Sequence, residues 1–408
     1  MFRTTALATA ALVATAASQA QTLEVMHWWT SPAESAAVKV LAEGAANAGT
    51  TWKDSAIAGM PVASKAIMTR LASGNPPAAA QFPFGRRIDE VGSEGLLGDI
   101  SDIAARDGWA KVVPPAVLQA VSVKGKVAAI PVTVAGVNWV WFSPKVLKAA
   151  GVATPPKTMD ELMAAAEKAK AAGFTGVALG TQAWQLNWLF NNLMLGNGGR
   201  AFYEQFTKTD PAVYQTPAAT KAMEQFLKMR TLVDAGATNR NWNDATNLVL
   251  TDKAAFQFMG DWAKAEFMNA GKKPGADFGC MLTPGGQDVY VIMGDALAVP
   301  GKVNAETVAA QKKLAAVVMD PRNQRRFALA KGSIPVRTDV PSVGFDDCAV
   351  SAMQLMGQPG KVIAGTPMTF TGDVNGALTD ALGKIWASPA ITPAAALTQL
   401  AGAMKAAK

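Results

Sequence analysis

Tryptophan is the residue type in this sequence that most suggests a binding site. The chain contains eleven tryptophans but only three tyrosines. An indole face packs against the C–H face of a sugar ring, while carboxylates, amides and cations bond the hydroxyl groups around the ring. Any single tryptophan is more often a core residue, but neighbours on a strand face opposite ways, so adjacent tryptophans are both buried only under two covered faces. The tryptophans expected at strand ends and loop starts are Trp28, Trp29, Trp184, Trp188, Trp242 and Trp262.

The single histidine limits the catalytic mechanisms open to the chain. Any mechanism that needs an imidazole base depends on His27, which follows an apolar strand and is more simply read as a packed or capping residue. No P-loop occurs, and residues 196–199 (Gly-Asn-Gly-Gly) lack the spacing of a dinucleotide fingerprint. One histidine and two distant cysteines, Cys280 and Cys348, do not make a zinc site of the usual spacing. We therefore expect no metal and no cofactor.

Two other functions remain open from the residues alone. A glycoside hydrolase would use two carboxylates, such as Glu34 and Asp295, at a defined separation that a sequence does not supply. A binder of a non-sugar solute, such as a polyamine or a metal ion, would need more carboxylates around its site. Reversible binding without turnover would distinguish a sugar binder from the hydrolase. A role as a ligand sensor for chemotaxis is compatible with sugar binding.

Length and composition indicate a folded protein of two domains. The chain has 408 residues, of which 50% are hydrophobic and 17% charged, too long for one ordinary core and too apolar for a disordered chain. The formal charge is +7, but the basic residues are spread out, with only short pairs at 312–313 and 325–326. A nucleic-acid-binding protein would gather them on one face, so we expect no nucleic-acid partner.

The N-terminus reads as a secretory signal peptide. A basic start at Arg3 precedes an apolar run over residues 6–17, and Ser18-Gln19-Ala20 offers small residues for cleavage after Ala20. The run is too short for a retained membrane anchor. We therefore expect a mature protein in the periplasm, where Cys280 and Cys348 could pair, although the sequence gives no distance between them.

Strands and helices alternate in the N-terminal part of the chain. Ser31 can cap a helix that Pro32 begins, with Glu34 at capping-box spacing. Strands are expected at residues 23–26, 51–57 and 78–82, with helices at 31–47 and around 67–71. Such β-α-β-α-β alternation implies a parallel sheet whose strand carboxyl ends form one ligand-binding rim.

The later chain predicts a second lobe and crossovers between the two lobes. Pro131 interrupts an apolar stretch at 128–134, and proline is poorly tolerated in a central strand, so a crossover is expected there. Others are expected near 289–295 and 332–336. Thr158 and Glu161 form a second capping-box pair, before a strand at 176–179 and helices over 182–232. We expect an α/β fold of two lobes, each a mostly parallel sheet flanked by helices, joined by about three hinge crossovers. The expected lobes are 21–132 plus 296–333 and 133–295 plus 334–408.

Several short motifs carry a family resemblance through their order and spacing. On these motifs the sequence resembles the sugar-binding components of bacterial ABC importers, in the glucose/mannose-type branch of the solute-binding family that includes maltose-binding protein. The likeness covers nearly the whole mature chain. The motifs are His27-Trp28-Trp29-Thr30-Ser31 with Glu34, Trp52-Lys53-Asp54, Ser73-Gly74-Asn75-Pro76-Pro77, Gln81, Asn138-Trp139, Trp242-Asn243-Asp244-Ala245-Thr246, Lys253-Ala254-Ala255, Met259-Gly260-Asp261-Trp262-Ala263, Pro284-Gly285, Asp295, Lys331-Gly332-Ser333-Ile334-Pro335-Val336-Arg337 and Asp346-Asp347-Cys348.

The resemblance implies that two lobes close on a sugar. The protein would be a monomer that delivers this sugar to an integral-membrane ABC permease, without covalent chemistry. Trp28 and Trp29 would stack on or flank the sugar, Trp262 would cover its ring from the second lobe, and polar side chains would bond its hydroxyl groups. Glu34 has an alternative role in the capping box, Lys331 in a hinge ion pair, and Asp261 in a turn or helix cap. The expected ligand-binding residues, including Trp184 from the tryptophans above, are Trp28, Trp29, Glu34, Gln81, Trp184, Trp262, Asp295 and Lys331.

The sequence also departs from the glucose pattern of that branch at three places. Phe82-Pro83-Phe84 stands where the branch carries a lysine or histidine, Val134-Ala135-Gly136 where it carries a His-Arg pair, and Met368-Thr369-Phe370 near its late histidine. A hydroxyl group left without a partner in a closed cleft costs roughly 1–3 kcal/mol. We therefore expect a larger, less polar or differently substituted sugar, or a glycoside. Submicromolar binding of free glucose would contradict this expectation.

Overall fold

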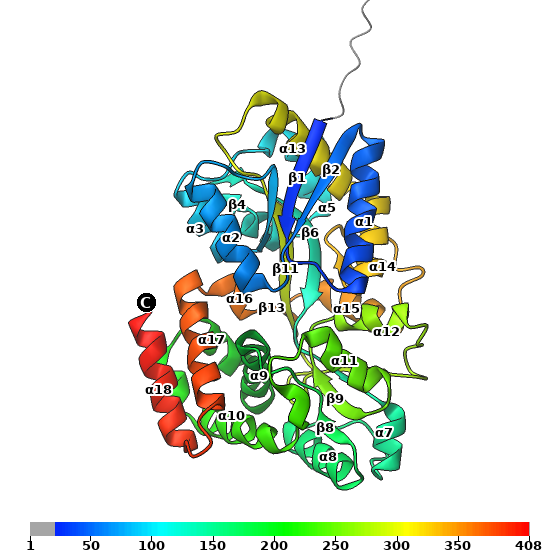
Figure 1. The fold of residues 1–408 in the computed structure, drawn as a ribbon, viewed down its shortest axis with the longest axis vertical. Helices are drawn as coiled ribbons and strands as arrows, with labels where there is room; N and C mark the ends of the chain where they lie inside the picture. Colours follow the sequence, from blue (N-terminus) through cyan, green and yellow to red (C-terminus); the bar gives the residue numbers. More distant parts are fainter. Residues whose placement is uncertain (1–20, 408) are drawn as a thin grey trace, which may run out of the picture.

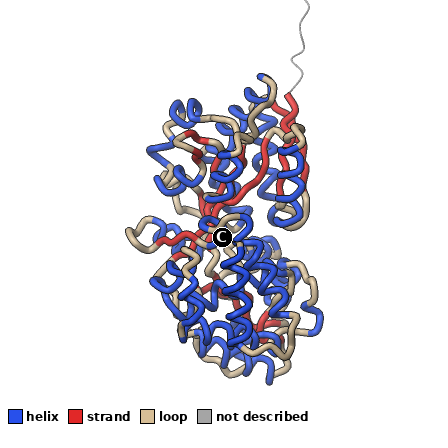
Figure 2. The backbone as a smooth tube through the Cα atoms, turned by 90° about the vertical axis from the view of Figure 1, so that its left-hand side faces the viewer, coloured by secondary structure: helices blue, strands red, loops and turns tan. Residues whose placement is uncertain are grey.

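A computed structural model describes residues 21–407 as two α/β halves joined by a narrow waist (Figure 1). The half that holds the larger sheet is called the N-terminal lobe and the other the C-terminal lobe. The tube view, turned by 90°, shows the same separation, with helices around the strands of each half (Figure 2). The expected signal peptide, residues 1–20, lies outside the described residues.

The N-terminal lobe is built on a seven-stranded sheet in the order β12-β6-β11-β3-β1-β2, with β13 paired to β11. The sheet is mixed: β1 runs parallel to β2 and β3, and β11 runs antiparallel to β3 and β6. The predicted β-α-β-α-β order is present at its start. The elements are β1 (Gln21–His27), α1 (Pro32–Asn47), β2 (Thr50–Ala56), α2 (Met60–Ala72), β3 (Ala79–Pro83), α3 (Arg86–Ser93), α4 (Ser101–Arg106), α5 (Trp109–Val112), α6 (Pro115–Ala120), β4 (Ser122–Val123), β5 (Lys126–Val127), β6 (Ala129–Gly136), β11 (Tyr290–Ala298), α13 (Ala305–Met319), α14 (Pro321–Lys331), β12 (Ile334–Pro335) and β13 (Val362–Ala364).

The C-terminal lobe contains a four-stranded mixed sheet in the order β10-β7-β9-β8. Only β8 and β9 pair in parallel there, so the expectation of mostly parallel sheets was too simple, although the α/β class is confirmed. The elements are β7 (Trp139–Phe142), α7 (Pro144–Ala149), α8 (Met159–Ala171), β8 (Thr175–Val177), α9 (Ala183–Thr207), η1 (Pro211–Gln215), α10 (Pro217–Lys228), η2 (Met229–Thr231), η3 (Ala235–Ala237), α11 (Trp242–Leu250), β9 (Ala254–Phe258), α12 (Ala263–Asn269), β10 (Gly279–Leu282), α17 (Gly372–Trp386) and α18 (Pro393–Ala406). Two further helices lie against the N-terminal lobe: α15 (Asp347–Met356) contacts β11 and β12, and α16 (Thr366–Thr369) contacts α3 and β11.

The strand β6 continues through Pro131, so the interruption predicted there is wrong. Pro131 lies opposite Ala296 of β11, and the register of this pair shifts between Asp295 and Ala296. Such an irregularity lets a sheet accept a residue without an N–H group. The crossover instead follows Gly136, the last residue of β6, and residues 137–138 lead into β7. The expected lobe boundaries at 132/133 and 295/296 therefore fall inside β6 and β11, and the lobe boundaries remain a prediction.

Both predicted capping boxes are present. At the start of α1, the Glu34 N–H donates to Ser31 Oγ at 3.2 Å and the Ser31 N–H donates to Glu34 Oε2 at 3.2 Å. Thr158 and Glu161 make the equivalent pair at the start of α8. These contacts satisfy donors that the first helical turn leaves free.

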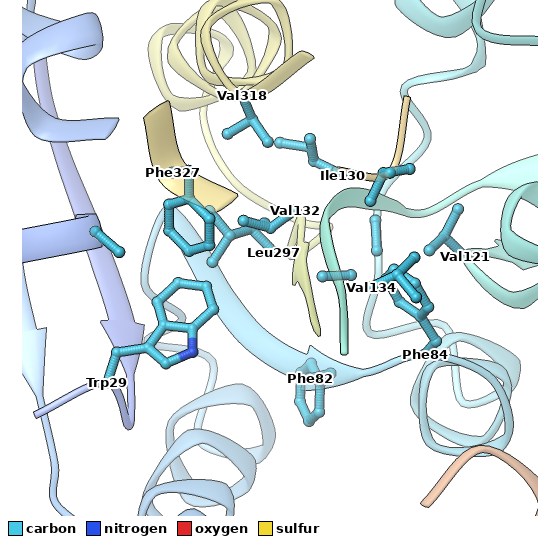
Figure 3. Close-up of a cluster of buried hydrophobic side chains, with 14 of the residues drawn as sticks. Trp29, Phe82, Phe84, Val121, Ile130, Val132, Val134, Leu297, Val318 and Phe327 are labelled. Carbon is cyan, nitrogen blue, oxygen red and sulfur yellow. The ribbon is translucent and has the colours of Figure 1, made fainter. Parts of the chain in front are cut away.

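The hydrophobic core forms two clusters, and the first extends from the N-terminal lobe into the C-terminal lobe. It includes Phe82 and Phe84, which are fully buried, and reaches Trp141 and Phe267 around the smaller sheet. Figure 3 shows part of it, with Trp29 and Phe327 close together. Their ring centroids are 5.3 Å apart in an edge arrangement. Two of the apolar residues at the departures from the glucose pattern are thus core residues.

Cys280 of β10 and Cys348 at the start of α15 form a disulfide. The sequence left open whether these two cysteines pair, and the structure shows that they do. Replacing both cysteines with alanine should lower the free energy of unfolding by about 2–4 kcal/mol, because the bond closes a long loop and so limits the unfolded chain. Guanidinium unfolding of both proteins, with reduced wild type as the control, checks this value. An unchanged midpoint would contradict it.

Candidate functional site

Five predicted residues from distant parts of the chain meet at one rim of the N-terminal sheet. They are called the polar cluster: Trp29, Glu34, Gln81, Asp295 and Lys331. Glu34 lies in the first turn of α1, Lys331 in the last turn of α14, Gln81 in β3 and Asp295 in β11. Trp29 lies between β1 and α1. All five are at least nine-tenths buried.

Glu34 and Lys331 form a buried ion pair. Glu34 Oε1 is 3.1 Å from Lys331 Nζ, and the two side chains are 9% and 5% exposed. Glu34 Oε2 accepts from the N–H groups of Thr30 and Ser31 at 3.1 and 3.2 Å. The cap role and the ion-pair role, which were alternatives in the sequence, therefore coexist. With both oxygens engaged, Glu34 is poorly placed to act as a catalytic acid or base.

Three buried polar atoms in the polar cluster have no hydrogen-bond partner among the described residues. They are Trp29 Nε1, Gln81 Nε2 and Asp295 Oδ1. The two donors lie near enough to Asp295 to lower its pKa, but neither meets the geometry of a hydrogen bond to it. Buried polar groups are nearly always paired with protein or water. These two donors and one acceptor therefore have hydrogen-bonding capacity that no described protein group uses.

The C-terminal lobe presents a row of three tryptophans: Trp184, Trp188 and Trp262. The ring centroids of Trp188 and Trp262 are 5.8 Å apart, and those of Trp184 and Trp188 are 6.3 Å apart. Trp184 and Trp188 sit four residues apart on α9, so they share one face of the helix. Trp188 was noted among the tryptophans but not selected as a binding residue, although this spacing was visible in the sequence.

Lys331 links the polar cluster to the tryptophan row. Its Nζ lies 5.3 Å from the ring centroid of Trp262, a cation–π contact. Trp262 is partly buried and packs against both core clusters. The structure thus brings six of the predicted residues, together with Trp184 through Trp188, into one continuous region that both lobes supply.

The adjacent residues Trp28 and Trp29 differ in how far their side chains are buried. Trp29 is 1% exposed, its ring packs against Phe327 and His27, and its Nε1 has no hydrogen-bond partner among the described residues, so of the two expected roles, stacking on a sugar or flanking it, this burial favours the second. Trp28 is only partly buried, and its backbone N–H donates to Gln81 Oε1 at 3.0 Å. This bond fixes the Gln81 amide, leaving its Nε2 free.

Burial raises the pKa of two carboxyl groups near the junction of the lobes. Burial raises the pKa of Asp295 to about 6, although Lys331 favours the charged form. Burial also raises the pKa of Asp261 to about 7. Asp261 Oδ2 accepts from the Gly136 N–H at 2.8 Å, so this residue, weighed in the sequence as a turn or cap, instead holds the end of β6 at the crossover.

Replacing Asp261 with asparagine should make stability less dependent on pH. Between about pH 4 and pH 7 the folded protein keeps this proton and the unfolded chain does not, so the free energy of unfolding falls as the pH rises. Asparagine can still accept from Gly136 but carries no charge. The variant should gain more than about 1 kcal/mol relative to wild type between pH 4.5 and pH 7.5. Chemical unfolding at both pH values measures this.

Asp234→Asn is the matched control for Asp261→Asn. The hydrogen bond from Arg240 lowers the pKa of Asp234, so ionised Asp234 stabilises the fold above pH 4. Over pH 4.5 to pH 7.5 its asparagine variant should be less stable than wild type by a nearly constant amount, because both states already have this group ionised there. Parallel pH profiles for wild type and Asp261→Asn would rule out the assigned role of Asp261.

His27 takes a structural position. It is 1% exposed, and its Nε2 lies 2.7 Å from Asp54 Oδ1. No cluster of three or more potential metal ligands occurs within residues 21–407. Over the same residues, no helix is both long and apolar enough to cross a membrane.

Sequence comparison assigns the chain to a known protein family. The model of the bacterial extracellular solute-binding protein family matches residues 29–317. A probable sugar-binding periplasmic protein of Rhizobium meliloti (strain 1021) is 40% identical over 347 residues, covering 85% of this chain and 83% of that protein. One from Brucella suis biovar 1 (strain 1330) is 37% identical over 339 residues, covering 83% and 80%. The chain belongs to the bacterial extracellular solute-binding protein family.

Solved structures confirm the two-lobe fold. A chitin oligosaccharide binding protein matches with a TM-score of 0.80 over 95% of this chain and 99% of that chain, at 19% identity. The maltose-bound MalE3 of T. maritima matches with a TM-score of 0.77 over 95% and 99%, at 16% identity. At sequence identities of 19% and 16%, these matches show a shared fold and not a shared ligand.

Proposed function

We propose that this protein is the periplasmic carbohydrate-binding component of an ABC importer. The observation that carries the proposal is the approach of the polar cluster of one lobe to the tryptophan row of the other, through Lys331 and Trp262. Hydroxyl-bonding groups opposite an indole surface suit a sugar ring. The names of the relatives from Rhizobium meliloti and Brucella suis support a sugar as the ligand.

The proposed mechanism is capture by lobe closure. A sugar contacts the polar cluster and the tryptophan row together only when the lobes are closed, so its binding shifts the open–closed equilibrium. The segments after β6 and before β11 connect the two sheets and are the natural hinges. The closed form, a monomer exported by its signal peptide, would then deliver the sugar to a membrane permease. No covalent step is needed, and we expect no turnover.

The departures from the glucose pattern restrict the ligand. Phe82, Phe84 and Val134 are fully buried in the core and offer no side-chain hydrogen bonds. Met368 packs against both core clusters and so places a thioether near the junction of the lobes. We propose a larger, less polar or differently substituted sugar, or a glycoside, in place of free glucose.

Thermal-shift screening of the mature protein against mono- and disaccharides tests the function. A sugar present at a hundred times its dissociation constant should add about 2.7 kcal/mol of stability. Calorimetric titration of each hit then gives its affinity, and an assay for released reducing sugar tests for turnover. Stabilisation by polyamines or metal ions but by no saccharide would overturn the proposal, and hydrolysis of the hit would replace it with an enzyme.

A further inference from the structure

A hollow lies on the flank of the N-terminal lobe, and Trp29 is the one residue of the polar cluster among its lining residues. Its volume is about 390 Å³, within the range of small-molecule sites. It is lined by one face of α1 and one face of β2, which lie side by side in the upper half of Figure 1. The strand β2 is the edge of the sheet and pairs only with β1 within the described residues. We call this hollow the flank hollow.

Strand geometry places a tryptophan and a carboxylate together in the flank hollow. Side chains alternate along β2, so Trp52 and Asp54 point to the same face, and both line the hollow. Lys39 lines it from α1, and Thr30 lines it from the segment between β1 and α1. A partly exposed indole thus stands next to an acid, an ammonium group and a hydroxyl group.

A hydrogen-bond network holds these groups in place. Asp54 Oδ1 lies 2.7 Å from His27 Nε2 and accepts from Trp52 Nε1 at 3.0 Å. The other carboxylate oxygen, Oδ2, has no protein hydrogen bond among the described residues. The buried His27 lines the hollow, and its Nδ1 is also without a partner there. The network orients the Trp52 ring before any ligand arrives, which lowers the entropic cost of binding.

The two opposite charges on the wall define the class of ligand. Lys39 disfavours a cation, and the Asp54 carboxylate disfavours an anion. Both bond well to hydroxyl groups, the first as a donor and the second as an acceptor. The Trp52 ring adds a flat apolar surface for C–H groups. A neutral, polyhydroxylated ring satisfies all three groups at once.

We propose that the flank hollow is a second carbohydrate site, which binds a single sugar ring independently of the junction of the lobes. Its lining residues come from the N-terminal lobe alone, so binding there needs no closure. The site would hold a sugar weakly, because the hollow is open, and would concentrate saccharide beside the capture site.

Nitrogen–proton NMR spectra of the mature protein test the proposal through the Trp52 indole N–H signal, which is assigned by its loss in Trp52→Phe. The probes are the methyl glycosides of glucose, galactose, mannose and xylose, each titrated to high millimolar concentration. At least one should shift this signal saturably. Asp54→Asn, which keeps the acceptor for His27 and Trp52 but removes the charge, should weaken that binding at least about tenfold.

Lys53→Gln is the matched control, because Lys53 lies on the same strand but faces away and pairs with Glu24 at 3.6 Å. It should bind like wild type. Trp262→Ala separates the two sites: the Trp52 response should survive that change even if the proposed function fails. A Trp52 signal that no glycoside moves, or a response equal in Asp54→Asn and wild type, would overturn the proposal. A response lost in Trp262→Ala would mean that the flank hollow only reports lobe closure.

Discussion

Replacing Trp262 with alanine should weaken binding of the transported sugar by about thirtyfold or more, because tryptophans at the centre of binding surfaces commonly contribute about 2 kcal/mol or more. Trp262 is the C-terminal-lobe residue in contact with Lys331, and it packs against both cores. Its removal takes away the indole surface and the cation–π partner together. Calorimetric titration with the sugar identified by thermal-shift screening measures the loss.

Trp386→Ala is the matched control for Trp262→Ala. Trp386 also lies beneath a cation, Arg230, whose guanidinium carbon is 5.8 Å from its ring centroid, but it belongs to α17, away from the polar cluster. Its loss should affect stability and leave sugar affinity within about twofold of wild type. Trp262→Phe should keep part of the affinity. Equal affinities for wild type and Trp262→Ala would remove the basis for a site between the lobes.

Replacing Lys331 with methionine should lower the free energy of unfolding by about 3–5 kcal/mol, the range for breaking one side of a buried ion pair. The change leaves the Glu34 carboxylate buried without its cation. It also leaves Asp295 without the nearby positive charge that lowers its pKa. Urea unfolding at pH 7.5 measures the loss. At pH 5 the loss should be smaller, because Asp295, whose pKa burial raises to about 6, is then largely protonated and no longer needs the cation.

The double variant Glu34→Gln/Lys331→Met tests the cause. Glutamine can still accept from the N–H groups of Thr30 and Ser31, so the helix cap survives while the unpaired charge does not. Most of the lost stability should return. A double variant as unstable as Lys331→Met would show that packing of the lysine side chain, and not its charge, holds this region together.

Helix starts were well predicted because their causes are local. Ser31 and Glu34, and Thr158 and Glu161, are three residues apart, and a capping box needs only that spacing. The continuation of the strand β6 through Pro131, where an interruption was expected, was missed for a non-local reason. Its tolerance depends on the register shift in β11, far along the chain, which no local pattern reveals.

The candidate site was predicted in part. Motif order selected the polar cluster and Trp262, but the sequence did not reveal how these residues share their bonds. Trp29 was expected to stack on or flank a ligand, and the structure places its ring in the core, where it packs against Phe327 of α14. The Asp261 contact with Gly136 was equally hidden, since it joins residues in different strands and turns.

The sequence by itself determined the α/β class, the alternation of elements and the helix caps, since these follow from side-chain types at spacings of two to four residues. It also named most of the residues that meet at the junction of the lobes. Only the tertiary structure decided which of them pair, which ring is buried and which polar atoms are left open. Pairing and burial depend on segments such as α1, β11 and α14 being folded against each other, and a distance of 3.1 Å between Glu34 and Lys331 has no signature in either local sequence.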